Sequence, residues 1–341
     1  MLLLLVAAAC TSSDGVERAA PISCRSGTAS GQGSSAQANA VSSWIREYQV
    51  ACADATVEYA SIGSGDGLAA FIAGTGDFAG SDSPLGADDQ PEADARCGSP
   101  AIHLPMVAGP IAIAYNVAGV DDLQLAPGTI AAIFAGRITD WDDPLISRDN
   151  PDTALPASPI VTVHRSDRSG TTDNFTRFLD AAAGPDWPHG SGGEWAASGG
   201  VGRDGSTGMV DEIERSDGAI GYVEASYADF HNLPMARIGN AAGEFVALTD
   251  DSVGLMLDGA IVAGDGGDLR LTLDYRAPVA GAYPLVLVTY EVVCQTGSPA
   301  LVKSFLAYTS SPAGQEAAAR LGYAPLPEAL RAEVADTVAG L

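Results

Sequence analysis

Basic residues are scarce in this chain. Its 341 residues include 17 Lys and Arg against 43 Asp and Glu, so the formal net charge is −26, and Lys303 is the single lysine. Binding to nucleic acid draws much of its free energy from basic side chains that displace counterions from phosphates. A chain this acidic has no such source, which excludes a nucleic-acid partner, and its charge favours solubility instead.

The apolar run at the N-terminus is short. MLLLLVAAA before Cys10 cannot span a bilayer as a helix and is typical of an export leader. Small residues before a cysteine, followed by polar residues, resemble the lipobox of bacterial lipoproteins. The resemblance implies that Cys10 is acylated, that 1–22 is signal and tether, and that the protein is anchored to the outer face of the cytoplasmic membrane. An ordinary secretory leader is the alternative.

Cysteines at metal or redox spacing are missing. No C-x-x-C motif occurs and no cysteine has a histidine at ligand spacing, which argues against zinc and thiol redox chemistry, and no metal ligands are assigned. Four cysteines remain after Cys10, an even number that predicts two disulfides in an exported chain. Of the three pairings, we favour Cys24 with Cys52, which flank the first helix, and by elimination Cys97 with Cys294.

The hydrophobic pattern predicts an α/β protein large enough for two domains, with 46% hydrophobic residues. Apolar positions from Ala38 to Tyr48 recur at three-four spacing, which predicts a helix beginning near Ser35. Residues 55–63 alternate as a strand and lead into a second helix. Further strands are predicted at 77–81, 105–117, 158–166 and 283–293, a helix at TIAAIFAG, a loop at WDDPLISRDNPD, and three helical stretches at the C-terminus.

Three turns that lead into predicted helices combine glycine with serine or threonine. They are Gly33-Ser34-Ser35, Gly63-Ser64-Gly65 and Ser169-Gly170-Thr171. The first N–H groups of a helix lack intrahelical partners and carry partial positive charge, so such turns can hold an anion. Each turn alone is more often a simple helix cap. Together with Arg165, whose planar fork of donors suits phosphate oxygens, they predict an oxyanion site.

Four blocks of sequence carry a more specific resemblance. They are SIGSGDGLAAFIAGTGDFAGSDSPL (61–85), GRITDWDDPLISRDNPD (136–152), VTVHRSDRSGTTDNFTRFL (161–179) and GAIGYVEASYA (218–228). In this order they resemble the phosphate-binding protein of the bacterial high-affinity phosphate ABC transporter. The resemblance implies a periplasmic-binding-protein type II fold, with two α/β lobes joined by two crossover strands near 106–116 and 280–292.

The resemblance divides the chain into lobe I, 23–108 with 287–341, and lobe II, 109–286. It implies a non-enzymatic receptor, without cofactor and monomeric, whose partners are inorganic phosphate, the permease subunits and the membrane through a lipid anchor. It assigns phosphate contacts to Ser35, Ala36, Ser64, Asp82, Arg165, Ser169, Gly170 and Thr171, with Asp167 orienting Arg165. Relatives usually have threonine and an aromatic residue in place of Ser35 and Ala36, and glycine in place of Arg168.

Asp82 is expected to decide selectivity. Phosphate at neutral pH still carries a proton, which a buried carboxylate can accept in a short charge-assisted hydrogen bond, whereas sulfate has no proton to offer. Sites that pair a ligand hydrogen can reject analogues lacking it by about 10⁴- to 10⁵-fold. The simpler interpretation is that Asp82 caps a turn.

Other functions have weaker support. GQGSSA, GDGLAA and GTGDFA each fit G-x-G-x-x-A, but none has a clear acidic ribose partner in a βαβ unit, so a dinucleotide enzyme is disfavoured. No G-x-S-x-G occurs, which argues against a serine hydrolase with a nucleophile elbow. The alternatives kept open are a phosphate-ester hydrolase and a binding protein for another tetrahedral oxyanion.

Overall fold

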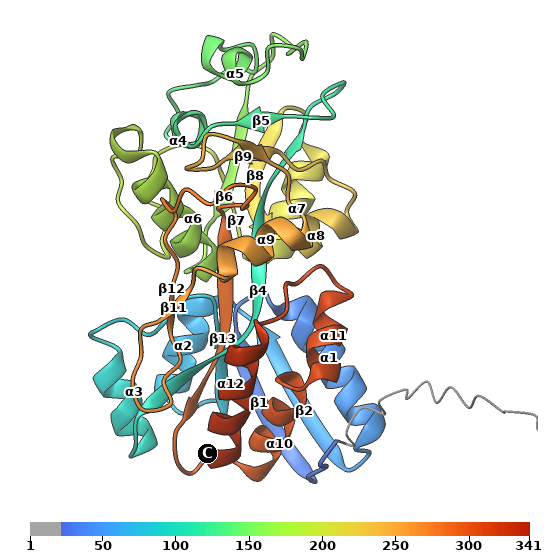
Figure 1. Ribbon diagram of the computed structural model, residues 1–341, viewed down its shortest axis with the longest axis vertical. Coiled ribbons are helices and arrows are strands. Elements are labelled where there is room, and N and C mark those ends of the chain that lie inside the picture. Colours follow the sequence, from blue (N-terminus) through green and yellow to red (C-terminus); the bar gives the residue numbers. More distant parts are fainter. Residues whose placement is uncertain (1–21) are drawn as a thin grey trace, which may run out of the picture.

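The computed structural model describes residues 22–341 and consists of two lobes that share one mixed sheet (Figure 1). Its eight strands lie in the order β2-β1-β3-β13-β4-β8-β6-β7. They are β1 (Gly27–Gly33), β2 (Ala55–Ser61), β3 (Phe78–Ser81), β4 (Ala101–Asn116), β6 (Val161–Arg165), β7 (Val201–Arg203), β8 (Ala219–Glu224) and β13 (Val286–Cys294). We call the lobe built on β1–β3 lobe I and the lobe built on β6–β8 lobe II.

In lobe I, β1 pairs in parallel with β2 and β3, and β13 runs antiparallel to β3. Its helices are α1 (Ala38–Ala51), α2 (Ser64–Ile72), α3 (Gln90–Cys97), α10 (Ala300–Thr309), α11 (Pro312–Ala319) and α12 (Glu328–Gly340). The apolar positions of α1 form one buried face, as their three-four spacing predicts: Val41, Trp44 and Tyr48 are fully buried. They pack with Phe305 of α10, so that the N- and C-terminal parts of the chain form one core.

In lobe II, β6 pairs in parallel with β7 and β8. A second, smaller sheet contains β10 (Phe245–Val246), β9 (Arg237–Gly239) and β5 (Gln124–Leu125). The helices are α4 (Pro127–Phe134), α5 (Pro144–Asp149), α6 (Gly170–Ala182), η1 (Gly184–Asp186), α7 (Gly205–Arg215), α8 (Ala225–Phe230) and α9 (Asp250–Leu257). Aromatic rings fill the core: the ring of Phe175 lies 4.9 Å from that of Phe134 and 4.3 Å from that of Tyr222.

The long strand β4 connects the lobes. Residues 101–110 pair with β13, and residues 111–116 pair with β8. The second crossing precedes β13, where the Ile111 N–H donates to the Leu285 carbonyl at 2.9 Å. Both crossings fall within the segments predicted from sequence, and Figure 1 shows both strands running between the lobes.

A hairpin of β11 (Ile261–Val262) and β12 (Leu271–Thr272) also reaches from lobe II to lobe I. At its tip, the Leu269 N–H donates to the His103 carbonyl at 2.9 Å, and the buried Leu269 side chain joins the core of lobe I. Residues 263–270 therefore pack on lobe I, although the sequence-based division placed them in lobe II.

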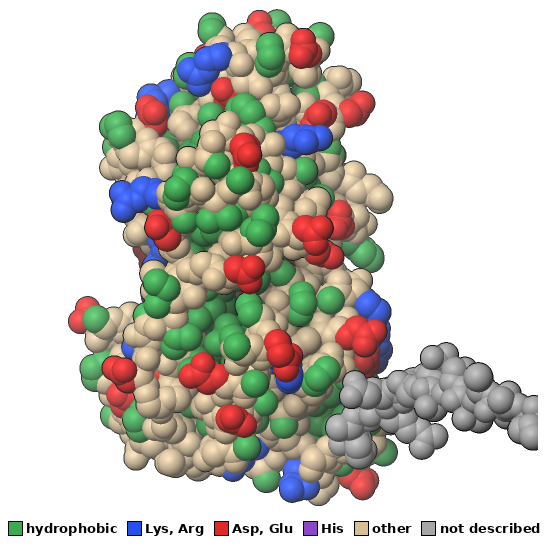
Figure 2. Space-filling model, in the orientation of Figure 1, with side chains coloured by type: hydrophobic (Ala, Val, Ile, Leu, Met, Phe, Trp, Pro, Cys, Tyr) green, Lys and Arg blue, Asp and Glu red, His purple; other side chains and the backbone are tan. Residues whose placement is uncertain are grey.

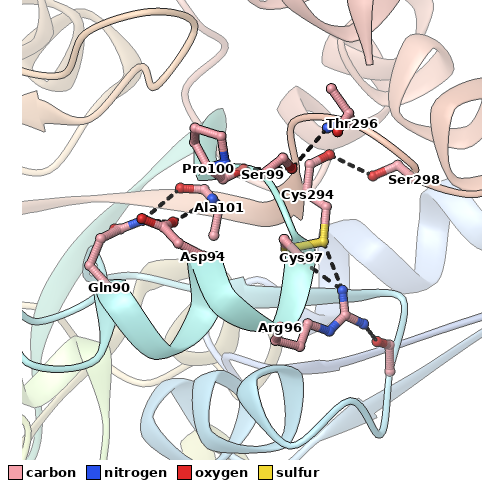
Figure 3. The surroundings of a disulfide bond; sticks show 11 residues. Gln90, Asp94, Arg96, Cys97, Ser99, Pro100, Ala101, Cys294, Thr296 and Ser298 are labelled. Atoms are coloured by element: carbon pink, nitrogen blue, oxygen red, sulfur yellow. Dashed lines mark hydrogen bonds between the residues drawn. A yellow bond between two sulfur atoms is a disulfide. The ribbon is translucent and has the colours of Figure 1, made fainter.

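The disulfides join Cys24 to Cys52 and Cys97 to Cys294, which is the favoured pairing. The second bond links the end of α3 to the end of β13 (Figure 3). Arg96 lies beside it and donates to Cys294 Sγ at 2.8 Å and to the Gly76 carbonyl at 2.6 Å. The disulfide thus fixes β13, the last strand in the sequence, covalently to the first hundred residues, as expected.

Two local predictions are wrong. The segment predicted as a loop at 141–152 contains α5, whose N-cap Asp143 accepts a hydrogen bond from the Leu145 N–H at 2.8 Å. Asp followed by Pro144 is itself a signal for a helix start, because proline suits the first helical position. The first helix begins at Ala38 rather than near Ser35, because residues 34–37 form an irregular turn.

The surface in Figure 2 carries acidic side chains on both lobes and fewer basic ones. Among residues 22–341, no helix has both the length and the apolar content needed to cross a membrane. The predicted lipidation site, Cys10, and the predicted tether up to residue 21 lie outside the described residues.

Candidate functional site

Asp82 lies at the centre of the predicted site, directly after β3, and is 3% exposed. Hydroxyl groups from both lobes point at its carboxylate. Ser34 Oγ donates to Oδ1 at 2.5 Å, and Ser64 Oγ and Thr171 Oγ1 each donate to Oδ2 at 3.4 Å. Three segments that are far apart in sequence therefore meet at one buried carboxylate.

The environment of Asp82 alters its acidity. Burial raises the pKa of Asp82 to about 6, against the opposing effects of the Ser34 hydrogen bond and the positive charge of Arg165. Near neutral pH the group is therefore mostly a carboxylate, but one that holds a proton more readily than an exposed aspartate. Such a group is suited to accept or share a proton with a ligand in the cleft.

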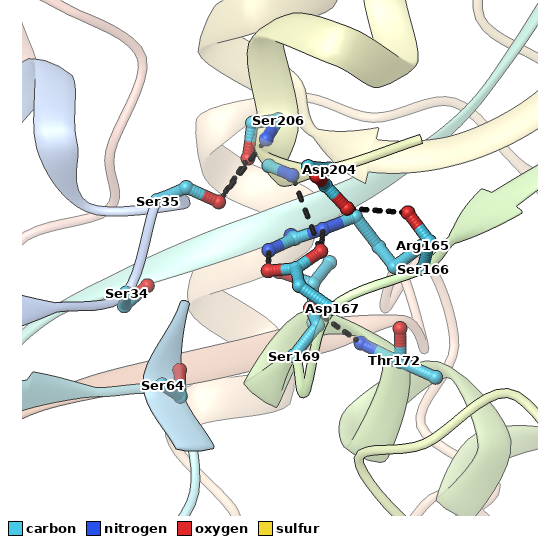
Figure 4. Close-up of polar contacts among 12 residues, drawn as sticks. Ser34, Ser35, Ser64, Arg165, Ser166, Asp167, Ser169, Thr172, Asp204 and Ser206 are labelled. Atoms are coloured by element: carbon cyan, nitrogen blue, oxygen red, sulfur yellow. Dashed lines mark hydrogen bonds and ion pairs between the residues drawn. The ribbon is translucent and has the colours of Figure 1, made fainter. Parts of the chain in front are cut away.

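Arg165 ends β6 and is 2% exposed. Its guanidinium makes a two-pronged contact with Asp167, Nε donating to Oδ1 at 2.6 Å and a terminal nitrogen donating to Oδ2 (Figure 4). Burial alone would raise the pKa of Asp167, but the hydrogen bonds and charge of Arg165 outweigh it and hold that pKa below the usual value. The ion pair fixes the guanidinium plane, as predicted for an orienting carboxylate.

The N-terminus of α6 is pressed against lobe I. The Ser169 hydroxyl caps the helix by accepting from the Thr172 N–H at 3.2 Å. Gly170 has no room for a side chain, because a Cβ there would lie 2.6 Å from Ser64 Oγ and 2.7 Å from Asp82 Cβ. Glycine at this position allows the first N–H groups of α6 to approach the carboxylate of the opposite lobe.

The first turn, residues 34–37, precedes α1 and contains two serines with different contacts. Ser35 Oγ does not bond to Asp82; it lies 3.0 Å from Ser206 Oγ and accepts from the Ser206 N–H at 3.1 Å. Its neighbour Ser34 contacts Asp82, and the Ala36 N–H donates to Ser34 Oγ at 3.1 Å. Ala36 itself is fully buried, so its contribution to the cleft is its backbone.

The start of α7 is a further element that the sequence analysis missed. Its Gly205 N–H donates to Asp167 Oδ1 at 3.2 Å, and Ser206 contacts Ser35 (Figure 4). The signal was present, since Asp204-Gly205-Ser206 is another turn of glycine and serine between a strand and a helix. It went unnoticed because the preceding strand, β7, has only three residues.

Direct hydrogen bonds also join the lobes around the site. The Gly65 N–H donates to the Arg168 carbonyl at 3.0 Å, and Asn174 Nδ2 donates to the Asp82 carbonyl at 2.7 Å. The side chain of Arg168 is 53% exposed and lies 3.8 Å from Glu194. Both residues line a pocket of about 470 Å³, whose lining also includes Ser64, Ser169 and Gly170.

The described part of the chain, 22–341, contains no group of three or more His, Cys, Asp or Glu side chains that could hold a metal ion. The site contains the carboxylates of Asp82 and Asp167, the guanidinium of Arg165, hydroxyl groups and helix N-termini. This donor set fits an oxyanion that still carries a hydrogen.

Comparisons with known proteins show the family to which this chain belongs. A family model described as the PBP superfamily domain matches residues 18–313. The phosphate-binding protein PstS 3 of Mycobacterium tuberculosis (strain ATCC 25618 / H37Rv) is 42% identical over 320 residues, which cover 91% of this chain and 86% of that protein. PstS 2 of the same strain is 43% identical over 317 residues, which cover 90% of this chain and 85% of that protein.

Solved structures of phosphate-binding proteins have a similar fold. A periplasmic phosphate-binding protein, PfluDING, determined with bound phosphate, has a TM-score of 0.70 at 25% identity and covers 90% of this chain and 93% of its own. A phosphate-binding protein from Stenotrophomonas maltophilia has a TM-score of 0.68 at 22% identity, with 91% and 94% covered, a likeness that bears on the fold alone.

Proposed function

Because this chain belongs to the PstS phosphate-binding proteins of the PBP superfamily, we propose that it binds inorganic phosphate and delivers it to an ABC transporter permease. Its fold is the predicted periplasmic-binding-protein type II fold, with two α/β lobes joined by crossing strands. In this proposal the protein is a receptor, and transport depends on its closing over the ligand and reopening at the permease.

The observation that carries the proposal is that both Asp82, from lobe I, and Arg165, from lobe II, are buried, and that the charge of Arg165 acts on the Asp82 carboxylate. A guanidinium and helix N–H groups attract the oxyanion. The carboxylate opposes any tetrahedral dianion that cannot donate a hydrogen to it. Phosphate satisfies both requirements, whereas sulfate satisfies only the first.

We propose that the ligand contacts are the eight residues assigned from sequence together with Ser34. Ser34 is included because its hydroxyl is the one in the first turn that contacts Asp82. Asp167 acts through Arg165. The proposed lobe boundaries remain those of the sequence analysis, with 263–270 resting on lobe I.

Closure of the cleft follows from where these groups lie. Ser34, Ser64 and Asp82 belong to lobe I, and Arg165 with the start of α6 belongs to lobe II. A ligand held by both sets binds the closed form more tightly than the open one, so it shifts the population toward closure. We also propose that Cys10 carries a lipid anchor, which holds the protein on the outer face of the cytoplasmic membrane. The protein is proposed to act as a monomer.

Titration calorimetry on protein freed of bound anion tests the function. Phosphate and arsenate, which both retain a proton near neutral pH, are expected to bind, and sulfate is expected to bind at least 10³-fold more weakly. Equal affinity for sulfate would favour a general oxyanion receptor and contradict the role of Asp82.

The hydrolase alternative is tested in the same preparation with a chromogenic phosphate ester. We expect no turnover, since the hydroxyl of Ser169 serves as the cap of α6. Turnover that is abolished by Ser169→Ala would contradict a purely binding role.

A further inference from the structure

Three consecutive carbonyl groups of the first turn each accept a hydrogen bond from a different tyrosine. Tyr59 Oη donates to the Ser34 carbonyl at 2.9 Å. Tyr227 Oη donates to the Ser35 carbonyl at 2.8 Å. Tyr323 Oη donates to the Ala36 carbonyl at 2.5 Å. The tyrosines come from β2, α8 and the segment between α11 and α12.

These bonds fix the direction of the amide groups in the turn. In a trans peptide, the carbonyl of one residue and the N–H of the next point to opposite sides. Holding the carbonyls of Ser35 and Ala36 therefore directs the N–H groups of Ala36 and Gln37 the other way. Both N–H groups point at Ser34 Oγ, at 3.1 and 3.4 Å, and Ser34 in turn contacts Asp82.

All three hydroxyls are dependable donors. Burial raises the pKa of Tyr59, Tyr227 and Tyr323 well above the ordinary value, and nearby carboxylates raise each of them further. The groups stay protonated throughout the physiological range, so each carbonyl keeps its partner. A tyrosine hydroxyl is also held by a rigid ring, which limits the directions in which the carbonyl can be drawn.

The tyrosines differ in the lobe to which they belong. Tyr59 and Tyr323 pack in the core of lobe I, as does the helix that the turn precedes. Tyr227 belongs to the core of lobe II and crosses the interface to reach Ser35. A second contact beside it also crosses, since Asn39 Nδ2 donates to Ser226 Oγ at 2.9 Å.

We propose that Tyr59, Tyr227 and Tyr323 are positioning residues that aim the amides of the first turn at phosphate, and that Tyr227 makes this alignment depend on closure of the lobes. The inference rests on the proposed function. It identifies Tyr227 as the residue of lobe II through which closure aligns the phosphate-binding amides of lobe I. In the open form, Tyr59 and Tyr323 still hold two of the carbonyls. Closure supplies the third.

The test compares single hydroxyl deletions by calorimetry with phosphate. Tyr227→Phe is expected to weaken binding about five-fold, the equivalent of the roughly 1 kcal/mol that one such hydrogen bond contributes. Tyr59→Phe and Tyr323→Phe are expected to weaken it by a similar factor. X-ray scattering at saturating phosphate is expected to show a larger open fraction for Tyr227→Phe than for the other two.

Tyr48→Phe is the matched control. Tyr48 is fully buried in lobe I, and its hydroxyl lies 2.7 Å from Ser304 Oγ, not against the turn. It is expected to lower the melting temperature as the other substitutions do, while leaving the phosphate Kd within twofold. If Tyr227→Phe and Tyr48→Phe have the same Kd for phosphate, Tyr227 does not link closure of the lobes to alignment of the turn.

A readout without ligand separates this inference from the proposed function. Hydrogen exchange in ligand-free protein is expected to accelerate at the Ser35 amide in Tyr59→Phe and at the Gln37 amide in Tyr323→Phe, but at neither amide in Tyr48→Phe. If the unmodified protein binds no phosphate, the proposed function fails, and faster exchange still supports the positioning role. Unchanged exchange overturns that role, whatever the protein binds.

Discussion

The two lobes contribute opposite chemistry to one site and are held together by different means. Lobe I supplies a carboxylate and hydroxyls, whereas lobe II supplies a guanidinium and a helix N-terminus. All four disulfide-bonded cysteines belong to lobe I, and lobe II depends on its aromatic core. Neither lobe alone presents both a positive group for the oxyanion and an acceptor for its hydrogen, so discrimination between ligands requires the closed pair.

Among the changes that test the difference between the lobes, removal of the Cys97–Cys294 bond of lobe I is expected to have the largest effect, a loss of stability. The bond spans 197 residues, and cross-links over long loops restrict the unfolded chain most. We expect Cys97→Ser with Cys294→Ser to lower the free energy of unfolding by about 4 kcal/mol in urea titrations.

The other disulfide is the matched control, because it lies in the same lobe but spans 28 residues. Its removal is expected to cost about 1 to 2 kcal/mol less. A greater loss on removal of the Cys24–Cys52 bond would show that loop length is not the deciding factor.

The contribution of lobe II is tested by Arg165→Ala. This change removes the charge-assisted hydrogen bonds to phosphate and leaves Asp167 without its partner, so calorimetry is expected to show a 10²- to 10³-fold loss of phosphate affinity. Arg237→Ala is the control, since Arg237 pairs with Asp122 on the surface of the same lobe. A loss of less than tenfold for Arg165→Ala would refute the central role of the guanidinium.

The contribution of lobe I is tested by Asp82→Asn. We expect phosphate binding to weaken by about tenfold and the preference for phosphate over sulfate to shrink, because the uncharged amide no longer repels a dianion without a proton. Asp77→Asn makes the same change in the same lobe, where Asp77 accepts from the Ser30 N–H at 2.8 Å. An unchanged selectivity in Asp82→Asn, equal to that of Asp77→Asn, would remove the proposed basis of discrimination.

The smallest expected effect is on the pH dependence of stability. Burial raises the pKa of Glu291 to about 8, and neither of its carboxylate oxygens has a hydrogen-bond partner among the described residues. The folded state therefore binds a proton that the unfolded state releases above about pH 4.5. It follows that stability falls as pH rises from about 4.5 to 8.

Urea unfolding at pH 6 and 7 measures that slope. Glu291→Gln keeps the shape of the side chain and removes the titration, so we expect it to flatten the decline by about 1 kcal/mol per pH unit. An identical slope in the variant would mean that Glu291 is ionised in the folded protein.

Much of the site could be predicted because it lies at the ends of strands. Ser64 begins α2, Asp82 follows β3 and Arg165 ends β6. Local pattern locates such element ends, and the family resemblance supplied the expected role of Asp82. The different contacts of Ser34 and Ser35 depend on the conformation of an irregular turn, which two adjacent serines in the sequence do not reveal.

The tyrosines and the hairpin could not be predicted for a different reason. Tyr323 contacts Ala36 across 287 residues of sequence, and Tyr227 contacts Ser35 across 192. Contacts of this kind are created by packing and leave no periodicity in the sequence. The same applies to residues 263–270, whose pattern gives no sign that they belong against the opposite lobe.

That hairpin is a third connection between the lobes. His103, fully buried in lobe I, accepts a hydrogen bond from the Leu85 N–H at Nε2, so its Nδ1–H is the donor to Asp268 Oδ1 at 2.8 Å. Rotation about the two crossing strands alone would pull this contact apart or bend the hairpin that holds it. A change in the angle between the lobes would therefore also have to be accommodated by this third connection.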